Sequence, residues 1–400
     1  MTVAVIIGGQ WGDEGKGKIV DLLAEKASYV VRFSGGNNAG HTVINNYGHF
    51  RLHLVPSGIF NPSTTCIIGN GVAVDPASLL EEMENLEKSG VSTEKLYISD
   101  RAHVIMSYHI QQDRLEEACR GQGALGTTRK GVGPAFADKT ARIGIRMGDL
   151  TNAEILRARL TPILEFKNRL LNLVYGAPPL NLDQVWEEYA AYGQRLSEQI
   201  KDVTSLLQQA LAQDSRILLE GAQGTMLDLD FGTYPYVTSS PPSAGGACQG
   251  SGIGPSHLDQ VLGVFKAYVT RVGQGPMPTE MAPAMGEAVR EKGQEYGATT
   301  GRPRRCGWFD TVAARFAAQV NGLHGAIITR LDVLDDLPSL KVCTHYSLDG
   351  RLVDTPPSDP DLFARCQPVY EEWPGWQTPT SMVRRFNDLP QPAQDYINAI

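Results

Sequence analysis

The sequence predicts an α/β fold: a mainly parallel central sheet flanked by helices, with a phosphate-loop-like first βα turn and inserted helical segments. First, apolar strand patterns alternate with helical patterns along the chain, which is typical of a parallel sheet covered by helices. Second, a short apolar run at residues 3–7 leads through a glycine-rich loop into helical spacing at residues 19–25. Third, the chain has 400 residues and no repeat or low-complexity tract. We therefore expect residues 1–400 to form a single domain.

The helices of the first half have recognisable start signals. Asp75 can cap a helix that has proline in its first turn and reaches about residue 88. Thr151 and Glu154 form a capping box, which predicts a long helix that continues towards residue 173.

The second half alternates in the same way. Helical spacing covers residues 182–213 and is interrupted in character at Gly193. Proline and glycine cluster at residues 239–254 and 273–283, which we interpret as long loops at the carboxyl edge of the sheet. The other expected elements are a strand at 216–220, a strand at 263–272, a helix at 310–320 and a buried strand at 325–329.

Composition narrows the function class. The net charge is -8, which argues against a nucleic-acid surface and against an anionic membrane. The six cysteines are scattered without a C-x-x-C pair, which suits reduced thiols in a cytosol. No leader and no apolar stretch of membrane-spanning length is evident. We expect a soluble, cytoplasmic protein.

The glycine-rich loop after the first strand indicates phosphate binding. Residues 12–18 fit the G-x-x-x-x-G-K half of a phosphate loop, whose amides and helix N-terminus can face phosphate oxygens. Ile19 stands where a Mg²⁺-binding Ser or Thr is usual. Asp13 and Glu14 place acids where phosphates should lie, which suggests a metal ligand or a base acting on a second substrate.

Two further loops carry polar chemistry. His41 follows a glycine-rich turn, and an imidazole there could stabilise charge on a transferring phosphoryl group. Residues 299–305 are polar, kinked by glycine and strongly cationic. Their guanidinium groups could clamp carboxylates with bidentate geometry, on a loop that closes as a lid.

Together these motifs, in order along nearly the whole chain, resemble the adenylosuccinate synthetase family. The matching segments are GQWGDEGKGKIVD, GGNNAGHT, GTT, VGPA, EGAQG, GTYPYVTSS, TTGRPRRCGWFD and TRLD. The resemblance implies GTP-dependent joining of L-aspartate to IMP, giving adenylosuccinate, GDP and phosphate. Because oxide is a poor leaving group, the 6-oxygen of IMP first accepts the γ-phosphoryl group, and the amine of aspartate then displaces phosphate.

The resemblance also implies the roles of individual residues. Asp13 and His41 are the expected catalytic pair, and Asp13 with the Gly40 carbonyl is expected to hold Mg²⁺. The expected GTP contacts are Gly12, Asp13, Glu14, Gly15, Lys16, Gly17, Lys18, Gly40, His41, Thr42, Arg304, Arg330, Leu331 and Asp332. The expected IMP contacts are Asp13, Glu14, Gly15, Lys16, Asn38, Ala39, Gly40, His41, Thr128, Arg142, Gln223, Thr238, Val272 and Arg302. The expected aspartate contacts are Ala298, Thr299, Thr300, Gly301, Arg302, Pro303 and Arg304.

Two of these positions carry more specific expectations. Arg142 matches a residue supplied across a dimer interface, so the resemblance implies a homodimer with shared sites. Asp332, at a strand end, can accept from guanine N1–H and the 2-amino group, which adenine cannot satisfy. Arg330 stands where the family usually has Lys, a mild departure because either stem can pack on the base.

The family normally continues past residues 389–400 with a further strand and a Gly-Pro-x-Arg loop that contacts guanine. This sequence stops at Ile400. From the sequence alone we expect weakened GTP affinity, relaxed base selectivity, or both.

Other readings stay open at this stage. One is a nucleotide-binding homologue whose turnover is impaired by the shortened C-terminus. Another is a ligase for a related purine monophosphate. A third is a generic phosphate-loop GTPase switch, against which the missing Ser or Thr after Lys18 and the GRPRR loop both count.

Overall fold

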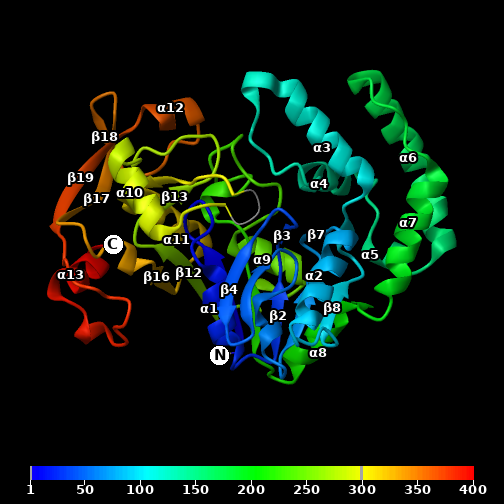
Figure 1. Ribbon diagram of the computed structural model, residues 1–400, viewed down its shortest axis with the longest axis horizontal. Coiled ribbons are helices and arrows are strands. Elements are labelled where there is room, and N and C mark those ends of the chain that lie inside the picture. The colour runs from blue at the N-terminus through cyan, green and yellow to red at the C-terminus, as the bar shows by residue number, and fades with distance from the viewer. Residues whose placement is uncertain (1, 298–300) are drawn as a thin grey trace. The chain divides into compact units, whose positions relative to one another are not determined.

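The computed structural model describes residues 2–297 and 301–400 (Figure 1). The chain divides into two compact units, each interrupted in sequence. Unit 1 comprises the residues up to Ile6, Gly17–Ala222 and Thr238–Gln260. Unit 2 comprises Ile7–Lys16, Gln223–Val237 and Val261–Ile400. The expectation of a single domain over residues 1–400 stays a prediction.

Unit 1 is built on a parallel sheet, as predicted. Its strands, in spatial order, are β10 (Ile200–Lys201), β8 (Leu96–Ser99), β6 (Thr65–Ile68), β2 (Tyr29–Arg32), β11 (Ile217–Glu220) and β1 (Val3–Gly8), whose last two residues belong to unit 2. Every neighbouring pair in this order is parallel. The β2–β11 register sets Arg32 opposite Glu220 at the carboxyl ends of both strands.

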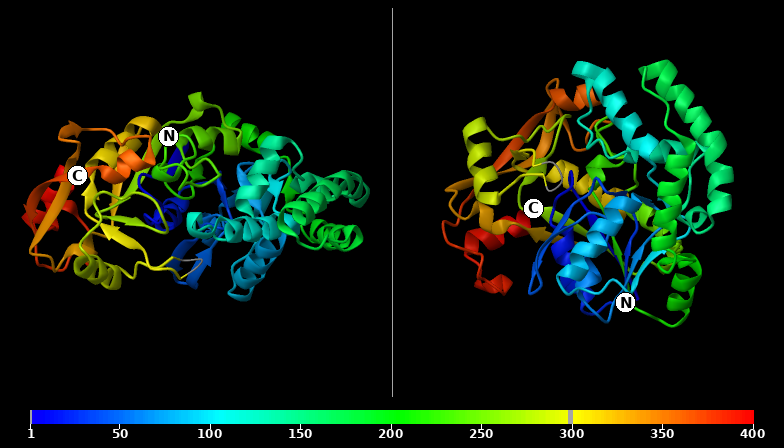
Figure 2. Two further views of the ribbon diagram at one scale, coloured as in Figure 1. Left: turned by 90° about the horizontal axis from the view of Figure 1, so that it is seen from above. Right: turned by 45° about the vertical axis from the view of Figure 1, so that its right-hand side comes forward.

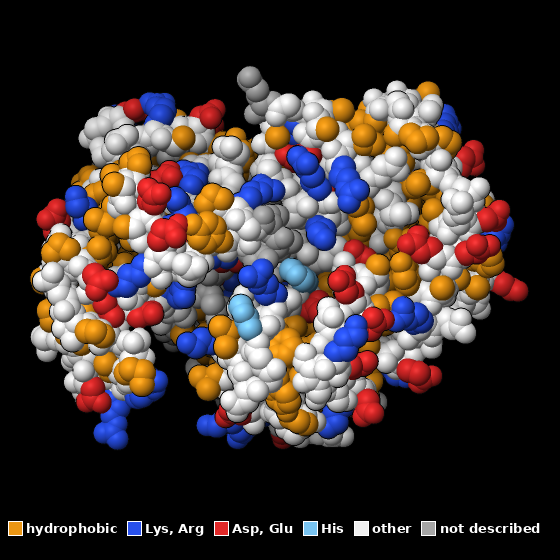
Figure 3. Space-filling view, in the orientation of Figure 1, with side chains coloured by type: hydrophobic (Ala, Val, Ile, Leu, Met, Phe, Trp, Pro, Cys, Tyr) orange, Lys and Arg blue, Asp and Glu red, His pale blue; other side chains and the backbone are white. Residues whose placement is uncertain are grey.

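Helices surround this sheet. They are α1 (Lys16–Ala24), α2 (Pro76–Lys88), α3 (Ser107–Arg120), α4 (Val132–Ala141), α5 (Met147–Leu150), α6 (Ala153–Tyr175), α7 (Leu182–Arg195), α8 (Val203–Ala212) and α9 (Ala244–Ser251). Figures 1 and 2 show α6 running beside α7, and these two helices contact each other. Figure 3 shows acidic and basic side chains intermixed over the surface that α6 and α7 form.

The start signal of α2 is confirmed, because the Asp75 side chain accepts hydrogen bonds from two amides of the first turn and proline follows it. The capping box expected for α6 is wrong. The cap is Asn152, whose Oδ1 accepts from the N–H groups of Glu154 and Ile155. An asparagine oxygen satisfies the same orphan amides as the threonine would have done.

The expected helix over residues 182–213 consists of two helices, and the break does not lie at Gly193. It lies at residues 196–202, where β10 joins the sheet. Gly193 is inside α7, where a Cβ atom would lie 2.0 Å from the Leu150 carbonyl oxygen. The glycine therefore permits a close approach of two backbones rather than a helix end.

Short strands complete unit 1. They are β3 (Gly35–Gly36), β7 (Val72–Val74) and β9 (His103–Val104), which pair in parallel, and the antiparallel hairpin of β4 (His41–Asn45) and β5 (Gly48–Leu52). Residues 239–254, expected to be a loop, contain α9, which the Ser243 side chain caps. The glycine-rich composition of α9 hides its helical character from pattern analysis.

Unit 2 is more strongly antiparallel. Its strands are β12 (Gln260–Lys266), β13 (Val269–Arg271), β14 (Arg305–Gly307), β15 (Phe309–Asp310), β16 (Gly325–Thr329), β17 (Ser339–Leu348), β18 (Arg351–Val353) and β19 (Gln367–Pro374). β12 pairs with β16 in parallel, whereas β17 pairs with β18 and β19 in antiparallel fashion. Its helices are α10 (Pro283–Gly293), α11 (Thr311–Asn321), α12 (Pro360–Arg365) and α13 (Gln391–Ala399).

Two strand expectations in unit 2 need correction. Residues 263–272 form two strands rather than one, since β12 ends at Lys266 and β13 pairs with β14. β16 is partly exposed instead of buried. The core of unit 2 gathers aromatic side chains from distant parts of the sequence, including Tyr268, Phe309 and Tyr396. Burying such side chains supplies most of the driving force for folding this unit.

The 3₁₀ helices are Ser57–Phe60, Gly121–Gly123, Thr225–Leu227, Pro255–His257, Leu331–Leu334 and Phe386–Asp388. Within residues 2–297 and 301–400, no helix combines the length and the apolar character needed to cross a membrane. All six cysteines are unpaired.

Candidate active site

The loop after β1 holds Asp13 in a strained conformation. Its φ is 59°, and the flanking Gly12 and Gly15 also have positive φ, at 88° and 94°. An aspartate tolerates this left-handed conformation better than most residues, but at some energetic cost. The Asp13 side chain is 29% exposed, and its Oδ2 lies 2.8 Å from Nε of Arg304. The loop therefore presents one accessible carboxylate, which is ion-paired in this structure.

Glu14 and Lys16 face inward instead. The buried Glu14 carboxylate accepts hydrogen bonds from the amides of Gln10 and Gly12, at 3.0 and 2.9 Å. Lys16 Nζ lies 2.6 Å from Glu14 Oε2 and donates to the carbonyl oxygen of Gln223. Of the two acids expected where phosphates should lie, only Asp13 is accessible, because Glu14 satisfies the amides of its own loop. Lys18 is exposed on α1.

Arg304 belongs to a buried charge cluster in unit 2. Glu295 accepts hydrogen bonds from Lys266 Nζ at 2.8 Å, from the Tyr268 hydroxyl and from Arg304 Nη1. Burial alone would raise the pKa of Glu295, but the nearby charges of Lys266 and Arg304 lower it to about 2. Burial opposes the charge of Arg304 as well, yet the charges of Asp13 and Glu295 raise its pKa. The cluster fixes Arg304 beside Asp13.

The other residues of the cationic loop have different surroundings. Arg302 is half-buried, and its carbonyl oxygen accepts from the Gly297 amide at 2.8 Å. Arg305 pairs with Glu280 and donates to the Gly275 carbonyl oxygen. Gly301 and Pro303 are exposed. Ala298, Thr299 and Thr300 lie outside the described residues.

A second group of functional residues lies in unit 1, at the carboxyl ends of β2 and β11. His41, the first residue of β4, is buried and contacts Glu220 Oε1 through Nδ1. Arg32 Nη1 lies 3.1 Å from the same Glu220 oxygen. Burial would raise the pKa of Glu220, but the hydrogen bond and charge of His41, with the charge of Arg32, lower it to about 2. These contacts therefore favour the ionised carboxylate.

The remaining predicted residues of unit 1 lie on several loops. The Ala39 carbonyl oxygen contacts His53 Nδ1, and Thr42 is exposed on β4.

Thr238 is buried, and its Oγ1 has no hydrogen-bond partner among the described residues. Arg142 ends α4 in the left-handed conformation and is exposed. Half-buried Gly40 precedes His41, Asn38 belongs to the same turn, and Thr128 precedes α4.

In unit 2, Arg330 also has a left-handed backbone and donates to the Gly293 carbonyl oxygen. Asp332 is exposed in the 3₁₀ helix that Leu331 begins, directly after β16. Gln223 is left-handed too, and Val272 follows β13 half-buried. Asp13, Arg142, Gln223 and Arg330 thus share a positive φ. Such strain often accumulates at functional sites.

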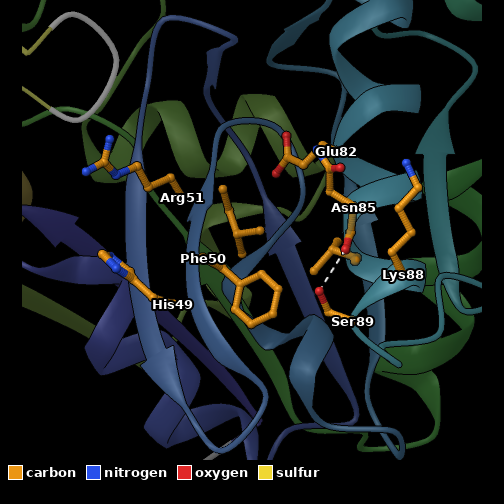
Figure 4. Close-up of a pocket in the computed structure, with 9 residues that line it drawn as sticks. His49, Phe50, Arg51, Glu82, Asn85, Lys88 and Ser89 are labelled. Carbon is orange, nitrogen blue, oxygen red and sulfur yellow. Dashed lines mark hydrogen bonds between the residues drawn. The ribbon is translucent and has the colours of Figure 1, made fainter.

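One pocket of unit 1 is lined by none of the predicted residues. It measures about 540 Å³ and lies between the β4–β5 hairpin and α2 (Figure 4). Phe50 faces it from the hairpin, and Asn85, Lys88 and Ser89 line it from α2. Because none of the predicted residues lines it, we do not assign the candidate site to it.

Comparison with known proteins decides the family. The family model described as adenylosuccinate synthetase matches residues 5–400. This chain belongs to the adenylosuccinate synthetase family. It is 54% identical over 397 residues to the adenylosuccinate synthetase of Dehalococcoides mccartyi, covering 99% of this chain and 94% of that protein. It is 52% identical over 400 residues to the one of Pelotomaculum thermopropionicum, covering 100% of this chain and 94% of that protein.

The fold agrees with the same family. The solved structure of the fully ligated adenylosuccinate synthetase of Plasmodium falciparum has a TM-score of 0.94 with this chain at 37% identity. The match covers 100% of this chain and 94% of that one. The predicted family and α/β fold class are confirmed. The chain is accordingly an enzyme, a GTP-dependent ligase of purine nucleotide biosynthesis.

Several residues around the site were not assigned a role from the sequence. Glu220 was noted only as part of a motif, and Arg32, Ser57, Lys266 and Glu295 were not noted. The sequence feature that could have identified Arg32 and Glu220 is a charged residue at the end of a buried apolar strand, as in YVVR and ILLE. A buried charge at a strand end needs an oppositely charged partner. Burying one ion without such a partner costs on the order of several kcal/mol.

Proposed function

We propose that this chain joins L-aspartate to IMP at the expense of GTP, giving adenylosuccinate, GDP and phosphate through 6-phosphoryl-IMP. Phosphorylation turns the 6-oxygen into a good leaving group, which the amine of aspartate then displaces. The observation that carries the proposal is the accessible carboxylate of Asp13, held in a strained loop beside Arg304, within a chain that matches the family from end to end.

Asp13 acts in this proposal as the general base that removes the N1 proton of IMP. Loss of that proton makes the 6-oxygen a stronger nucleophile towards the γ-phosphorus. The charge cluster around Glu295 holds Arg304 beside this carboxylate, and Arg304 is also a proposed contact of the substrate aspartate.

We propose Mg²⁺ as the metal ion that this enzyme uses. Mg²⁺ prefers oxygen ligands and usually takes only one or two from the protein, with substrate phosphates and water supplying the rest. Among the described residues no group of three or more His, Cys, Asp or Glu lies together, which is consistent with so few protein ligands. The Asp13 carboxylate and the Gly40 carbonyl oxygen are the proposed ligands. A bound Mg²⁺ would neutralise charge on the phosphates.

His41 is the proposed donor to the transferring phosphoryl group or to the 6-oxygen. The buried hydroxyl of Thr238, which has no partner among the described residues, supports a ligand contact at that loop. A phosphate or ribose oxygen of IMP would satisfy it. Asn38, Thr128, Gln223 and Val272 complete the proposed IMP set.

For the guanine base we propose Asp332 as the selecting residue. Its exposed carboxylate follows a strand end, where α/β sheets commonly place ligands. Arg330, adjacent to it, would pack against the base. We also propose that the enzyme is a cytoplasmic homodimer in which Arg142 reaches the partner's IMP. The exposed, left-handed position of Arg142 at the end of α4 supports that role.

Replacing Arg302 by leucine should raise the KM for aspartate. The lost group is a charge-assisted contact, so the expected rise is about 10- to 100-fold, with the KM values for IMP and GTP changed by less than about threefold. Steady-state kinetics with each substrate varied in turn measures this. Arg305→Leu is the matched control, because Arg305 is tied to Glu280 and should leave the aspartate KM near its original value. Unchanged aspartate kinetics in Arg302→Leu would remove that residue from the site.

A product assay tests the function itself. The 400-residue chain is incubated with IMP, L-aspartate, GTP and Mg²⁺, and adenylosuccinate is followed by chromatography while each component is omitted in turn. We expect product only in the complete mixture, with one GDP and one phosphate for each adenylosuccinate. Product without aspartate or without GTP, or IMP binding with no product at all, would contradict the proposal.

A further inference from the structure

Glu220 is a fully buried carboxylate whose oxygens have four partners. Oε1 accepts from Arg32 Nη1 at 3.1 Å and from the Ser57 hydroxyl at 2.8 Å, and it contacts Nδ1 of His41. Oε2 accepts from the Ser57 amide at 2.8 Å. All of these residues belong to unit 1. These contacts therefore hold the Glu220 carboxylate in a fixed position beside Nδ1 of His41.

The contact decides where the proton of the imidazole resides. The lone pair of an unprotonated Nδ1 would be repelled by a carboxylate oxygen at hydrogen-bond distance, so Nδ1 must carry a proton that it donates to Glu220. Arg32 Nη1 also lies 3.0 Å from Nδ1, but it donates to the same Glu220 oxygen at 3.1 Å, so the carboxylate is the acceptor that the guanidinium and the imidazole share. With the Nδ1 proton donated to Glu220, a neutral ring carries its lone pair on Nε2.

The ring is also fixed by packing. A Cβ atom on Gly17 would lie 2.9 Å from His41 Cβ and 3.2 Å from Ser57 Oγ, so α1 passes directly against the histidine. Arg32 is braced in turn by Nε, which donates to the Ser34 carbonyl oxygen at 3.1 Å. Neither the imidazole nor the carboxylate can turn without disturbing strands β2, β4 and β11. This degree of restraint is what a proton-transferring group requires.

We propose that Glu220 is a positioning residue for His41: it fixes the Nδ1–H tautomer and the orientation of the ring, so that Nε2 meets the reacting phosphoryl group or 6-oxygen. The inference rests on the proposed function, in which His41 takes part in catalysis. Arg32 and Ser57 hold the carboxylate in place.

The decisive variant is Glu220→Gln, which keeps the shape of the side chain and an oxygen for Ser57. Its amide would offer an N–H group to Nδ1 and so favour the wrong tautomer. We expect kcat to fall about 10²-fold or more, while the KM values for IMP and GTP change by less than about threefold. Glu220→Asp, which restores the charge one methylene short, should recover part of the lost kcat.

Glu82→Gln is the matched control. Glu82 is another buried carboxylate of unit 1, and it accepts from the amides of His53, Leu54 and Val55 rather than from His41. Burial raises the pKa of Glu82 to about 7, so an uncharged amide resembles its native state. We expect Glu82→Gln to keep kcat within about threefold of the original enzyme. A generic cost of altering a buried carboxylate would lower both variants alike.

A double-mutant cycle separates positioning from simple structural support. If Glu220 acts through His41, then adding Glu220→Gln to His41→Asn should lower kcat by less than about threefold beyond the single His41 change. If the two losses multiply instead, Glu220 acts independently of His41 and the inference is overturned.

Nitrogen-15 NMR of the histidine rings gives a test that needs no active variant. The signals of His41, identified by comparison with His41→Asn, should show a protonated Nδ1 in the original enzyme. A neutral ring protonated only at Nε2 would overturn the inference even if Glu220→Gln failed to fold. An original enzyme that makes no adenylosuccinate would contradict the proposed function. An active enzyme whose Glu220→Gln variant keeps its kcat would contradict this inference alone.

Discussion

Asp13→Ala is expected to lose nearly all turnover, by about 10²- to 10⁴-fold in kcat, while IMP still binds. The change removes the one accessible carboxylate of the loop after β1 and leaves the purine N1 proton without an acceptor. The expected IMP contacts on other loops stay intact, so the Kd for IMP should change by less than about threefold. Single-turnover assays and isothermal titration with IMP measure the two quantities.

A control for backbone strain is available in the same chain. Asp214 also has a left-handed backbone, with φ of 51°, but it is exposed in the connection between α8 and β11 and is not a predicted site residue. Asp214→Ala should carry the same conformational cost without the loss of activity. Asp13→Asn, which tolerates the left-handed backbone yet cannot accept a proton, should be as inactive as Asp13→Ala. An Asp13→Asn enzyme with near-normal kcat would remove Asp13 from the role of base.

Glu295→Ala is expected to destabilise the protein by about 3–5 kcal/mol, the usual cost of removing one partner from a buried charge cluster. Lys266 is buried and lies 2.8 Å from both Glu295 oxygens, so the substitution would leave its ammonium without its counter-charge. Burial already lowers the pKa of Lys266 in spite of Glu295. Unfolding by denaturant, followed by fluorescence, measures the change.

The ion pair between Glu295 and Lys266 should make the free energy of unfolding depend on pH in the acid range. Because the folded-state pKa of Glu295 is about 2, below the ordinary value of 4.5, its contribution is full above pH 4.5 and is lost as the pH falls towards 2. In the Glu295→Ala variant, the free energy of unfolding should change less with pH between about 4.5 and 2. The Glu280–Arg305 pair is the control, since both side chains are substantially exposed and Glu280→Ala should cost at most about 1 kcal/mol. An equal effect of the two substitutions would contradict the argument.

The sequence predicted those features that local patterns determine. The cap of α2, the strand β11 and the helix α11 follow from side chains within a few residues, and all three were placed correctly. The separation of β12 from β13 and the partial exposure of β16 depend on pairings with distant segments, which no local period contains. The ten-residue strand β17 was not predicted either, and it pairs with β15, which precedes it, and with β18 and β19, which follow it.

In the candidate site, too, the sequence predicted some features and not others. Motif spacing pointed to Asp13 and His41, whose roles in catalysis stay predictions. It could not show that Glu14 turns inward to its own loop, because the direction of a side chain depends on which amides lack partners. Nor could it pair His41 with Glu220, which is 179 residues away along the chain.

The inward ion pair of Lys16 has a consequence for nucleotide binding. Its ammonium already satisfies Glu14 and the carbonyl of Gln223, so an incoming phosphate gains only the difference between the new contact and the old ones. Phosphate binding at Lys16 would replace these existing contacts with new ones. A lone orthophosphate offers little to offset the contacts given up, whereas a nucleotide brings a base and a sugar that add their own. We therefore expect Lys16 to favour whole nucleotides over free orthophosphate.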